Sequence, residues 1–232
     1  MNAASATTFL VDVDNTLLDN DAVQEDIQQH LAASYGSEAR DRYWAILEQL
    51  MQDLGYRDYL GALQKYRAEH PTHVELLAMS SFLVDYPFAE RLYPHALAAL
   101  AHLRRLGPTV ILSDGDVVFQ PRKVERSGIA AKVDGDVLIY IHKELALADV
   151  ERRYPSRRYV LIDDKPRILS AVKQSWGARV TTILVRQGQY ASDSQALASF
   201  KPADLSIAHV SDLIDMAPSI LLNDPLKTAS SA

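Results

Sequence analysis

The sequence contains no cysteine, no excess of basic residues and no long apolar run, and these absences exclude several classes of function. None of the 232 residues is cysteine, so a disulfide framework, a thiolate zinc site and a cysteine nucleophile are excluded. The net charge is −6, from 30 acidic and 24 basic residues, which gives no basic footprint for nucleic acid or an anionic membrane surface. We therefore expect neither nucleic acid nor a membrane as partner.

No segment approaches the ~20 consecutive apolar residues that a membrane-spanning helix requires. Residues 1–8 also lack the basic and apolar regions of a secretion signal, and we therefore expect a cytoplasmic protein. With 232 residues of which 48% are hydrophobic, the chain can bury a substantial core. It is long enough for one large domain or for a core with a smaller insert.

The most informative segment is residues 9–18, an apolar run interrupted by Asp12 and Asp14. A short apolar run predicts a buried strand, and open α/β sheets carry their chemistry at the carboxyl ends of their strands. Residues two apart in an extended chain project to the same side, so both acids can reach one metal or one substrate atom. A calcium loop is excluded because Leu17 and Val23 stand where it needs glycine and a bidentate acid. A solvated acidic turn remains the structural alternative.

Further apolar runs alternate with helical patterns. The runs with strand character are residues 110–112, 137–141, 159–162 and 182–185. The helical patterns are residues 94–106, 143–154, 166–176 and 210–216. This alternation predicts an α/β fold, a Rossmann-like, mostly parallel sheet of about five strands with helices on both faces.

One long block interrupts the alternation. Residues 21–90 have helical periodicity and no convincing strand, with connections expected near residues 18–20 and 88–93. We predict a catalytic core of residues 1–18 and 91–217, a helical cap of residues 19–90 and a loosely held tail of residues 218–232. The cap would cover the acids, exclude water and select the substrate. The alternative is that these helices only enlarge the core.

Polar residues follow the apolar runs in a fixed order. They are Asp12-Val13-Asp14-Asn15-Thr16, then Ser113, then Lys143, then Asp163-Asp164. Taken together, these four motifs resemble those of the haloacid dehalogenase-like (HAD) hydrolase superfamily, and specifically its phosphatases with a helical cap. The resemblance spans residues 9–215, and the helical block falls where that family carries its cap.

The resemblance implies a role for each motif. Asp12 would be the nucleophile and Asp14 the general acid and base. Ser113 would bind the transferring phosphoryl group, and Lys143 would offset charge on that group and on Asp12. These roles describe phosphoryl transfer through a covalent aspartyl-phosphate.

The same resemblance implies a magnesium site formed by Asp12, Asp14, Asp163 and Asp164, in which Asp14 contributes its backbone carbonyl. Asp164 is the expected direct carboxylate ligand, and Asp163 is expected to act through water or through a neighbouring group. Elementary electrostatics agrees with a metal. A phosphomonoester is a dianion, so an anionic nucleophile can approach it only where cations offset the charge. Clustered carboxylates would otherwise raise one another's pKa values.

Some assignments have competitors. Lys132 and Lys165 are alternatives to Lys143 as the active-site lysine, because one precedes the third strand and the other adjoins the acidic pair. Ser113 could instead cap the loop that follows it.

Asp114 and Asp116, which flank Gly115, are expected to be turn residues. His142 is expected to be structural, because the mechanism needs no imidazole. No specific prediction is made for the polar residues of the insert, which include Tyr56, Arg57, Tyr59 and Arg67.

The sequence therefore predicts a Mg²⁺-dependent phosphomonoester hydrolase that acts on a small phosphorylated metabolite through an aspartyl-phosphate. Within the same superfamily, a haloacid dehalogenase and a phosphomutase are the alternatives. A dehalogenase needs neither a metal nor a second acid like Asp14, so the intact motif argues against it. From another class, a non-catalytic module could bind a phosphorylated metabolite at the same residues. The sequence leaves the physiological substrate and the oligomeric state undetermined.

Overall fold

The computed structural model describes residues 5–72 and 75–222. Its centre is a six-stranded sheet in the order β3-β2-β1-β4-β5-β6, in which every neighbouring pair is parallel. The strands are β1 Ser5–Val11, β2 Thr109–Asp114, β3 Val137–Tyr140, β4 Ser156–Asp163, β5 Val180–Val185 and β6 Leu205–Ile207. The predicted α/β class and parallel sheet are confirmed, with one strand more than expected. The additional strand, β6, was missed because it has only three residues and none of them is buried.

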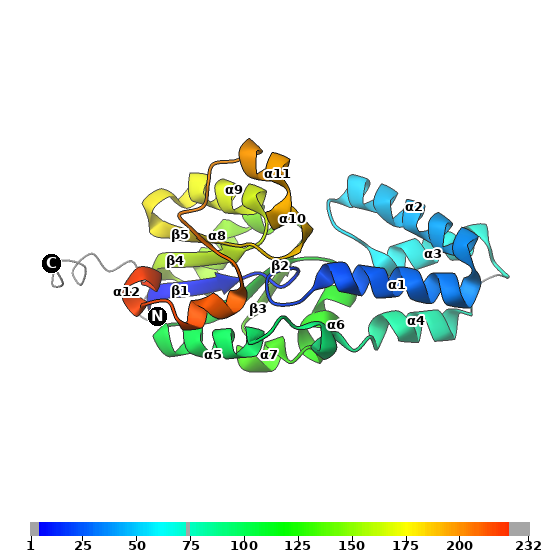
Figure 1. Ribbon diagram of the computed structural model, residues 1–232, viewed down its shortest axis with the longest axis horizontal. Coiled ribbons are helices and arrows are strands. Elements are labelled where there is room, and N and C mark those ends of the chain that lie inside the picture. Colours follow the sequence, from blue (N-terminus) through cyan, green and yellow to red (C-terminus); the bar gives the residue numbers. More distant parts are fainter. Residues whose placement is uncertain (1–4, 73–74, 223–232) are drawn as a thin grey trace.

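Helices cover both faces of the sheet (Figure 1). The core helices are α5 Ala96–Leu106, α6 Phe119–Arg126, α7 Ile129–Lys132, α8 Leu147–Arg153, α9 Pro166–Trp176, α10 Gly188–Ser192, α11 Ser194–Ser199 and α12 Pro218–Leu221. The 3₁₀ helices are η1 Phe88–Arg91, η2 Lys143–Leu145, η3 Gly177–Arg179 and η4 Val210–Ile214. Successive side chains of β1 point to opposite faces of the sheet. Phe9 packs in the apolar cluster that includes α5, and Leu10 packs in the apolar cluster that includes α9.

The predicted helices match these elements with local differences. Residues 166–176 form a helix as expected, and Pro166 stands in its first turn. The helix expected at 94–106 begins only at Ala96, because His95 before it adopts a left-handed conformation with φ 63°. Residues 143–154 divide into η2 and α8, and the helix expected at 210–216 is the shorter 3₁₀ helix η4, Val210–Ile214.

The C-terminal prediction is partly wrong. Within the tail expected to be loose, α12 forms and buries Leu221 completely. An apolar side chain that packs into the core holds this segment in place. Residues 223–232, which the same prediction covers, lie outside the described residues.

Helices α1 Asn20–Tyr35, α2 Ser37–Leu54, α3 Tyr59–Glu69 and α4 Leu76–Val84 form a helical insert between β1 and η1. In Figure 1 the insert lies beyond one end of the sheet. Between residues 20 and 84 the described chain contains no strand, as expected. The exact division into a core and a cap at residues 18–19 and 90–91 stays a prediction.

The two connections of the insert lie side by side. Asp19 donates its backbone N–H to the Arg91 carbonyl over 2.8 Å, and Tyr93 donates to the Leu17 carbonyl over 3.0 Å. Leu18 and Leu92 form an isolated antiparallel bridge between these bonds. The chain therefore leaves and rejoins the core at one point, immediately after the acids of β1.

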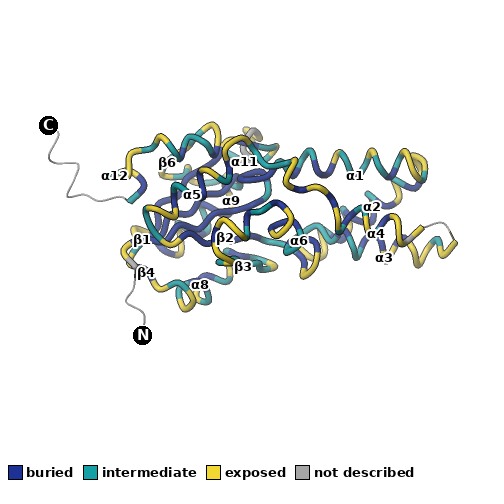
Figure 2. Tube along the Cα trace, turned by 90° about the horizontal axis from the view of Figure 1, so that it is seen from below, coloured by how far each residue is buried: buried dark blue, intermediate teal, exposed yellow. Residues whose placement is uncertain are grey.

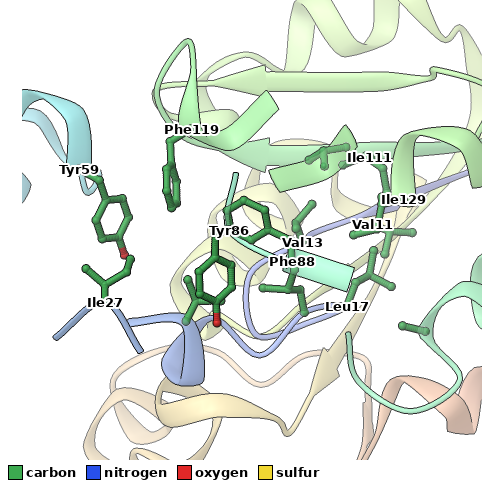
Figure 3. Close-up of a cluster of buried hydrophobic side chains, with 14 of the residues drawn as sticks. Val11, Val13, Leu17, Ile27, Tyr59, Tyr86, Phe88, Ile111, Phe119 and Ile129 are labelled. Atoms are coloured by element: carbon green, nitrogen blue, oxygen red, sulfur yellow. The ribbon is translucent and has the colours of Figure 1, made fainter. Parts of the chain in front are cut away.

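The insert and the core share a continuous apolar cluster (Figure 3). The Phe119 ring of α6 lies 4.5 Å from the Tyr59 ring and 5.4 Å from the Phe88 ring, measured between centroids. Such aromatic contacts fix the orientation of neighbouring elements as well as burying area. Figure 2 shows that buried residues concentrate in the strands, whereas the insert carries many intermediate and exposed residues. In the described residues, no helix combines the length and the apolar character that crossing a membrane would require.

Candidate active site

The first acids of the sequence lie where β1 ends. Asp12 is 1% exposed, and its N–H donates to the Ile162 carbonyl of β4 over 3.0 Å. A tight turn then reverses the chain, with Asn15 in the left-handed region at φ 58°. The Asn15 side-chain oxygen accepts the N–H of Asn20 over 3.0 Å and so ties the turn to the start of α1. Asp14 lies in this turn with its side chain 21% exposed.

Lys143 is the lysine that reaches Asp12. Its Nζ lies 2.6 Å from Asp12 Oδ1 and 2.6 Å from Asp163 Oδ2, and it also donates to the Leu112 carbonyl over 3.2 Å. Burial alone would lower the pKa of Lys143, but the charges of Asp12 and Asp163 outweigh burial and raise it. The ammonium is therefore a permanent cation beside Asp12. Lys132, one of its competitors, is an exposed residue of α7.

Asp12, Asp163 and Asp164 form a buried acidic cluster. Each offers one carboxylate oxygen within 4.8 Å of the other two. Parallel pairing of β1 with β4 produces this proximity, because Val11 is opposite Ile162 and the next residue in each strand direction is an acid, Asp12 or Asp163. Such a set of oxygen donors could hold a metal ion.

The members of this acidic cluster differ in how their oxygens are satisfied. Asp163 accepts the Lys165 N–H over 2.8 Å at Oδ1 and faces Lys143 at Oδ2. Among the described residues, neither oxygen of Asp164 has a hydrogen-bond partner, although Asp164 is fully buried. Asp12 Oδ2 is likewise without a partner in this part of the chain. Buried carboxylate oxygens are normally paired or bound to a metal, so these atoms fit a cation.

Burial and mutual repulsion disfavour the ionised forms of these acids. Burial raises the pKa of Asp12 to about 6, against the lowering effect of Lys143 and with a further increase from Asp163. The pKa of Asp164 is raised mainly by burial, against the opposing charge of Lys165. The positive charge of the lysines therefore offsets only part of the cost of ionising these acids. A divalent cation would offset more of it.

Lys165 is a second cation beside these acids. Burial alone would lower its pKa, but Asp12 and Asp164 raise it. Its Nζ lies 5.8 Å from the centre of the Tyr190 ring. The structure thus brings both Lys143 and Lys165 near Asp12, but only Lys143 contacts it.

The residues after β2 hold the surrounding loops. The Ser113 hydroxyl is buried and accepts a hydrogen bond from Gln120 Nε2 over 2.9 Å. Asp114 Oδ1 accepts the Lys143 N–H over 2.7 Å, so it orients the segment that carries the lysine. Asp116 Oδ1 accepts the N–H groups of Val118 and Phe119 over 2.7 and 2.6 Å. Both aspartates therefore hold loops by accepting backbone N–H groups, as expected of turn residues.

Lys123 is a residue that sequence reasoning missed. Its Nζ lies 2.6 Å from Asp14 Oδ1 and 2.8 Å from Asn20 Oδ1, and the residue is 1% exposed. It occupies the middle of α6 and belongs to no motif, so no local pattern distinguishes it from a solvated lysine. Only the packing of α6 against the turn after β1 brings it to Asp14.

A cavity of about 310 Å³ opens beside Asp14, between the core and the insert. The core contributes Asp14, Asn15, Asp114, Gly115, Asp116, Phe119, Gln120, Lys123, Lys165, Pro166, Arg167, Tyr190 and Phe200 to its wall. The insert and the loop between α2 and α3 contribute Asn20, Gln24, Met51, Gly55, Tyr56, Arg57 and Tyr59. Of the predicted site residues, Asp14 lines this wall; within the described residues, the wall does not include Asp12, Ser113, Lys143, Asp163 or Asp164. The wall combines four basic side chains with three acidic ones and several aromatic rings.

Contacts of the insert with this region are close. The loop between α2 and α3 begins at Gly55, which has φ +83°, and a side chain there would overlap the ring of His142. His142 thus packs against the insert, in agreement with the structural role expected for it. Tyr59 Oη and Arg57 Nε are buried without a hydrogen-bond partner among the described residues. Burial of the Tyr59 hydroxyl raises its pKa, so it stays a neutral donor.

Comparison with known proteins identifies the family. A profile of haloacid dehalogenase-like hydrolases matches residues 6–186. The chain belongs to this family. The matched range includes Asp12, Asp14, Ser113, Lys143 and the acidic pair after β4, and the roles of these residues stay predictions. Comparison with curated proteins gave no significant match.

Solved structures support the same assignment. A chain from Burkholderia xenovorans LB400, solved as a haloacid dehalogenase-like hydrolase, is 57% identical, with a TM-score of 0.87 over 91% of this chain and 96% of that one. The HAD-hydrolase YfnB from Bacillus subtilis, bound to magnesium, is 16% identical, with a TM-score of 0.61 over 95% and 100% of the two chains. An L-2-haloacid dehalogenase from Xanthobacter autotrophicus, with chloropropionic acid covalently bound, is 17% identical, with a TM-score of 0.59 over 90% and 97%. The last two share the fold.

We predict that Tyr59→Phe leaves the free energy of unfolding unchanged or raises it by up to about 1 kcal/mol, because an unpartnered buried hydroxyl is costly. Tyr43→Phe is the matched control. Tyr43 Oη donates to the Tyr59 carbonyl over 2.8 Å, so losing it should cost about 1 kcal/mol. Urea denaturation measures both. Equal destabilisation by the two substitutions would mean that the Tyr59 hydroxyl has a partner.

Proposed function

We propose that this hydrolase is a Mg²⁺-dependent phosphomonoester hydrolase of small phosphorylated metabolites that works through an aspartyl-phosphate. The observation that carries the proposal is the carboxyl group of Asp164, buried with both oxygens unpartnered among the described residues, beside a free oxygen of Asp12. A hard divalent cation with oxygen ligands would satisfy these atoms. The placement of Asp14 at the cavity wall supports a reaction that needs a proton donor.

Asp12 and Asp164 would hold the Mg²⁺ through their carboxylates, and the family resemblance adds the backbone carbonyl of Asp14. Asp163 already pairs with Lys143 and accepts a backbone N–H, so it would orient the lysine rather than bind the metal directly. When bound, the cation would offset charge on the phosphoryl oxygens and allow a carboxylate to approach them.

The residues of the chain then account for the two steps. Asp12 attacks phosphorus and forms an oxygen–phosphorus bond, while the bond from phosphorus to the leaving oxygen breaks and Asp14 protonates that oxygen. In the second step Asp14 takes a proton from water, which attacks phosphorus and releases Asp12 and inorganic phosphate. Lys143 holds Asp12 in place and offsets its charge throughout.

Dehalogenation is the second candidate, because one observation favours it. Lys143 and Lys165 supply positive charge around Asp12 without any metal. In that reaction Asp12 would displace halide from carbon, and water would then hydrolyse the ester. A halide leaves unprotonated, however, so the reaction gives Asp14 no task in its first step. It also leaves the oxygens of Asp164 unsatisfied.

The test of the proposal is a panel of small phosphomonoesters and 2-chloropropionate, assayed with Mg²⁺ and with EDTA. We expect Mg²⁺-dependent release of phosphate and no release of chloride. Asp12→Asn should fold and lose nearly all turnover, because it removes the nucleophile without disturbing the backbone. Chloride release that persists in EDTA would favour the dehalogenase. Phosphate release by Asp12→Asn would exclude Asp12 as the nucleophile.

We predict that Asp164→Asn weakens Mg²⁺ binding more than Asp163→Asn does, because only Asp164 has both oxygens free. Isothermal titration calorimetry with MgCl₂ measures this order. The reverse order would make Asp163 the direct ligand.

Mg²⁺ should also raise the Tm of the wild type more at about pH 7.5 than at about pH 5. The raised pKa of Asp12 gives stability at low pH that is lost as the pH rises through about 6, and the metal would restore it.

We predict that Asp14→Asn separates the two proton transfers. A p-nitrophenolate leaves without protonation and an alkoxide does not, so formation of the aspartyl-phosphate should slow far more for an alkyl phosphate than for p-nitrophenyl phosphate. The second step also loses its base, so the aryl substrate should give a burst of nitrophenolate and then a slow steady state. Rapid-quench kinetics test this. No burst, with equal losses on both substrates, would exclude Asp14 as acid and base.

A further inference from the structure

The ammonium of Lys123 is bound on two sides inside the protein. Its Nζ lies 2.6 Å from Asp14 Oδ1 and 2.8 Å from Asn20 Oδ1, and its side chain is 2% exposed. A buried lysine is costly unless its charge and its N–H groups are satisfied. Within the described residues, Asp14 is the acid with which this ammonium pairs.

This contact treats the two oxygens of Asp14 differently. Oδ1 accepts from Lys123, whereas Oδ2 has no hydrogen-bond partner among the described residues. Asp14 lines the cavity, so one oxygen is held by the protein and the other is available to a bound molecule. A carboxyl group held at Oδ1 keeps a single orientation, and in its protonated form it would present the proton to the leaving group from Oδ2.

The second partner connects this arrangement to the helical insert. Asn20 is the first residue of α1, and its N–H is bound by Asn15 in the turn that carries Asp14. Lys123 itself belongs to α6, whose Phe119 packs against Tyr59 of the insert. The lysine therefore joins three parts of the cavity wall: a core helix, the acidic turn and the start of the insert.

We infer that Lys123 is a positioning residue, which together with Asn20 holds Asp14 in the orientation for protonating the leaving group. The inference rests on the proposed function. A positioning role differs in its kinetics from a purely structural ion pair, which would affect all substrates alike. It differs equally from substrate binding by the lysine, which would act through KM.

The decisive measurement is the rate of aspartyl-phosphate formation in single turnovers, compared between an alkyl phosphate and p-nitrophenyl phosphate. Lys123→Met should lower the alkyl rate by roughly 10-fold to 100-fold and the aryl rate by less than about 3-fold, because loss of orientation matters only where protonation is needed. KM should change by less than about 3-fold for both substrates. Arg122→Met is the matched control, since it removes a cation from the same helix at a side chain that is 40% exposed and outside the cavity. It should leave both rates unchanged.

A double-mutant cycle tests whether Lys123 acts through Asp14. In the Asp14→Asn background, Lys123→Met should lower the alkyl rate by less than about 3-fold, because the group that it positions is already lost. Asn20→Ala, which leaves the ion pair intact, should change the ratio of alkyl to aryl rates in the same direction by several-fold. If Lys123→Met does not fold, this ratio in Asn20→Ala decides the question.

Several results would overturn the inference. They are equal losses on both substrates, a rise in KM at unchanged kcat, full additivity with Asp14→Asn, or an unchanged ratio in Asn20→Ala. The wild type in the same assay separates the two proposals. If it forms no aspartyl-phosphate from either ester, the proposed function fails and takes this inference with it. If it forms the intermediate and the variants keep its substrate ratio, only the inference on Lys123 fails.

Discussion

The burial of several carboxyl groups together at the ends of β1 and β4 is the constraint on which the site depends. Parallel pairing sets Val11 opposite Ile162, so Asp12 comes beside Asp163 and Asp164 in a region with little water. Burial and mutual repulsion raise the pKa of Asp12 and of Asp164. Each further feature of the site offsets part of this cost.

Three lysines supply the compensation, and each comes from a different segment. Lys143, from η2, bridges Asp12 and Asp163. Lys165 adjoins the acidic pair, and Lys123, from α6, pairs with Asp14. In the described structure none of these lysines pairs with Asp164, and both oxygens of Asp164 are without a hydrogen-bond partner. The arrangement thus leaves uncompensated carboxylate oxygens beside Asp12, and a divalent cation could bind there.

The insert forms one side of the cavity that Asp14, Lys123 and Lys165 line. Its two connections are hydrogen-bonded to each other directly after the acidic turn, so the helices α1 to α3 extend from the point where the chemistry is expected. The aromatic contact of Tyr59 with Phe119 fixes the insert against α6. Enlargement of the core and covering of the acids were alternatives at the level of sequence. The shared apolar cluster shows that the helices enlarge the core. A cavity lies between the two parts beside Asp14, and the role of the helices as a cap stays a prediction.

The sequence by itself determined the class of fold, the family and the order of the motifs, because apolar periodicity and acids at strand ends are local properties of the chain. The family resemblance selected Lys143 as the active-site lysine, and the structure places this lysine against Asp12, while its catalytic role stays a prediction. Burial of Leu221, pairing of the short strand β6 and the contact of Lys123 with Asp14 were decided only by tertiary structure. Each joins residues distant in the sequence, and Lys123 and Asp14 are separated by 109 positions. The choice between Asp163 and Asp164 also depends on which oxygens their neighbours leave free, and this is a property of packing that no spacing encodes.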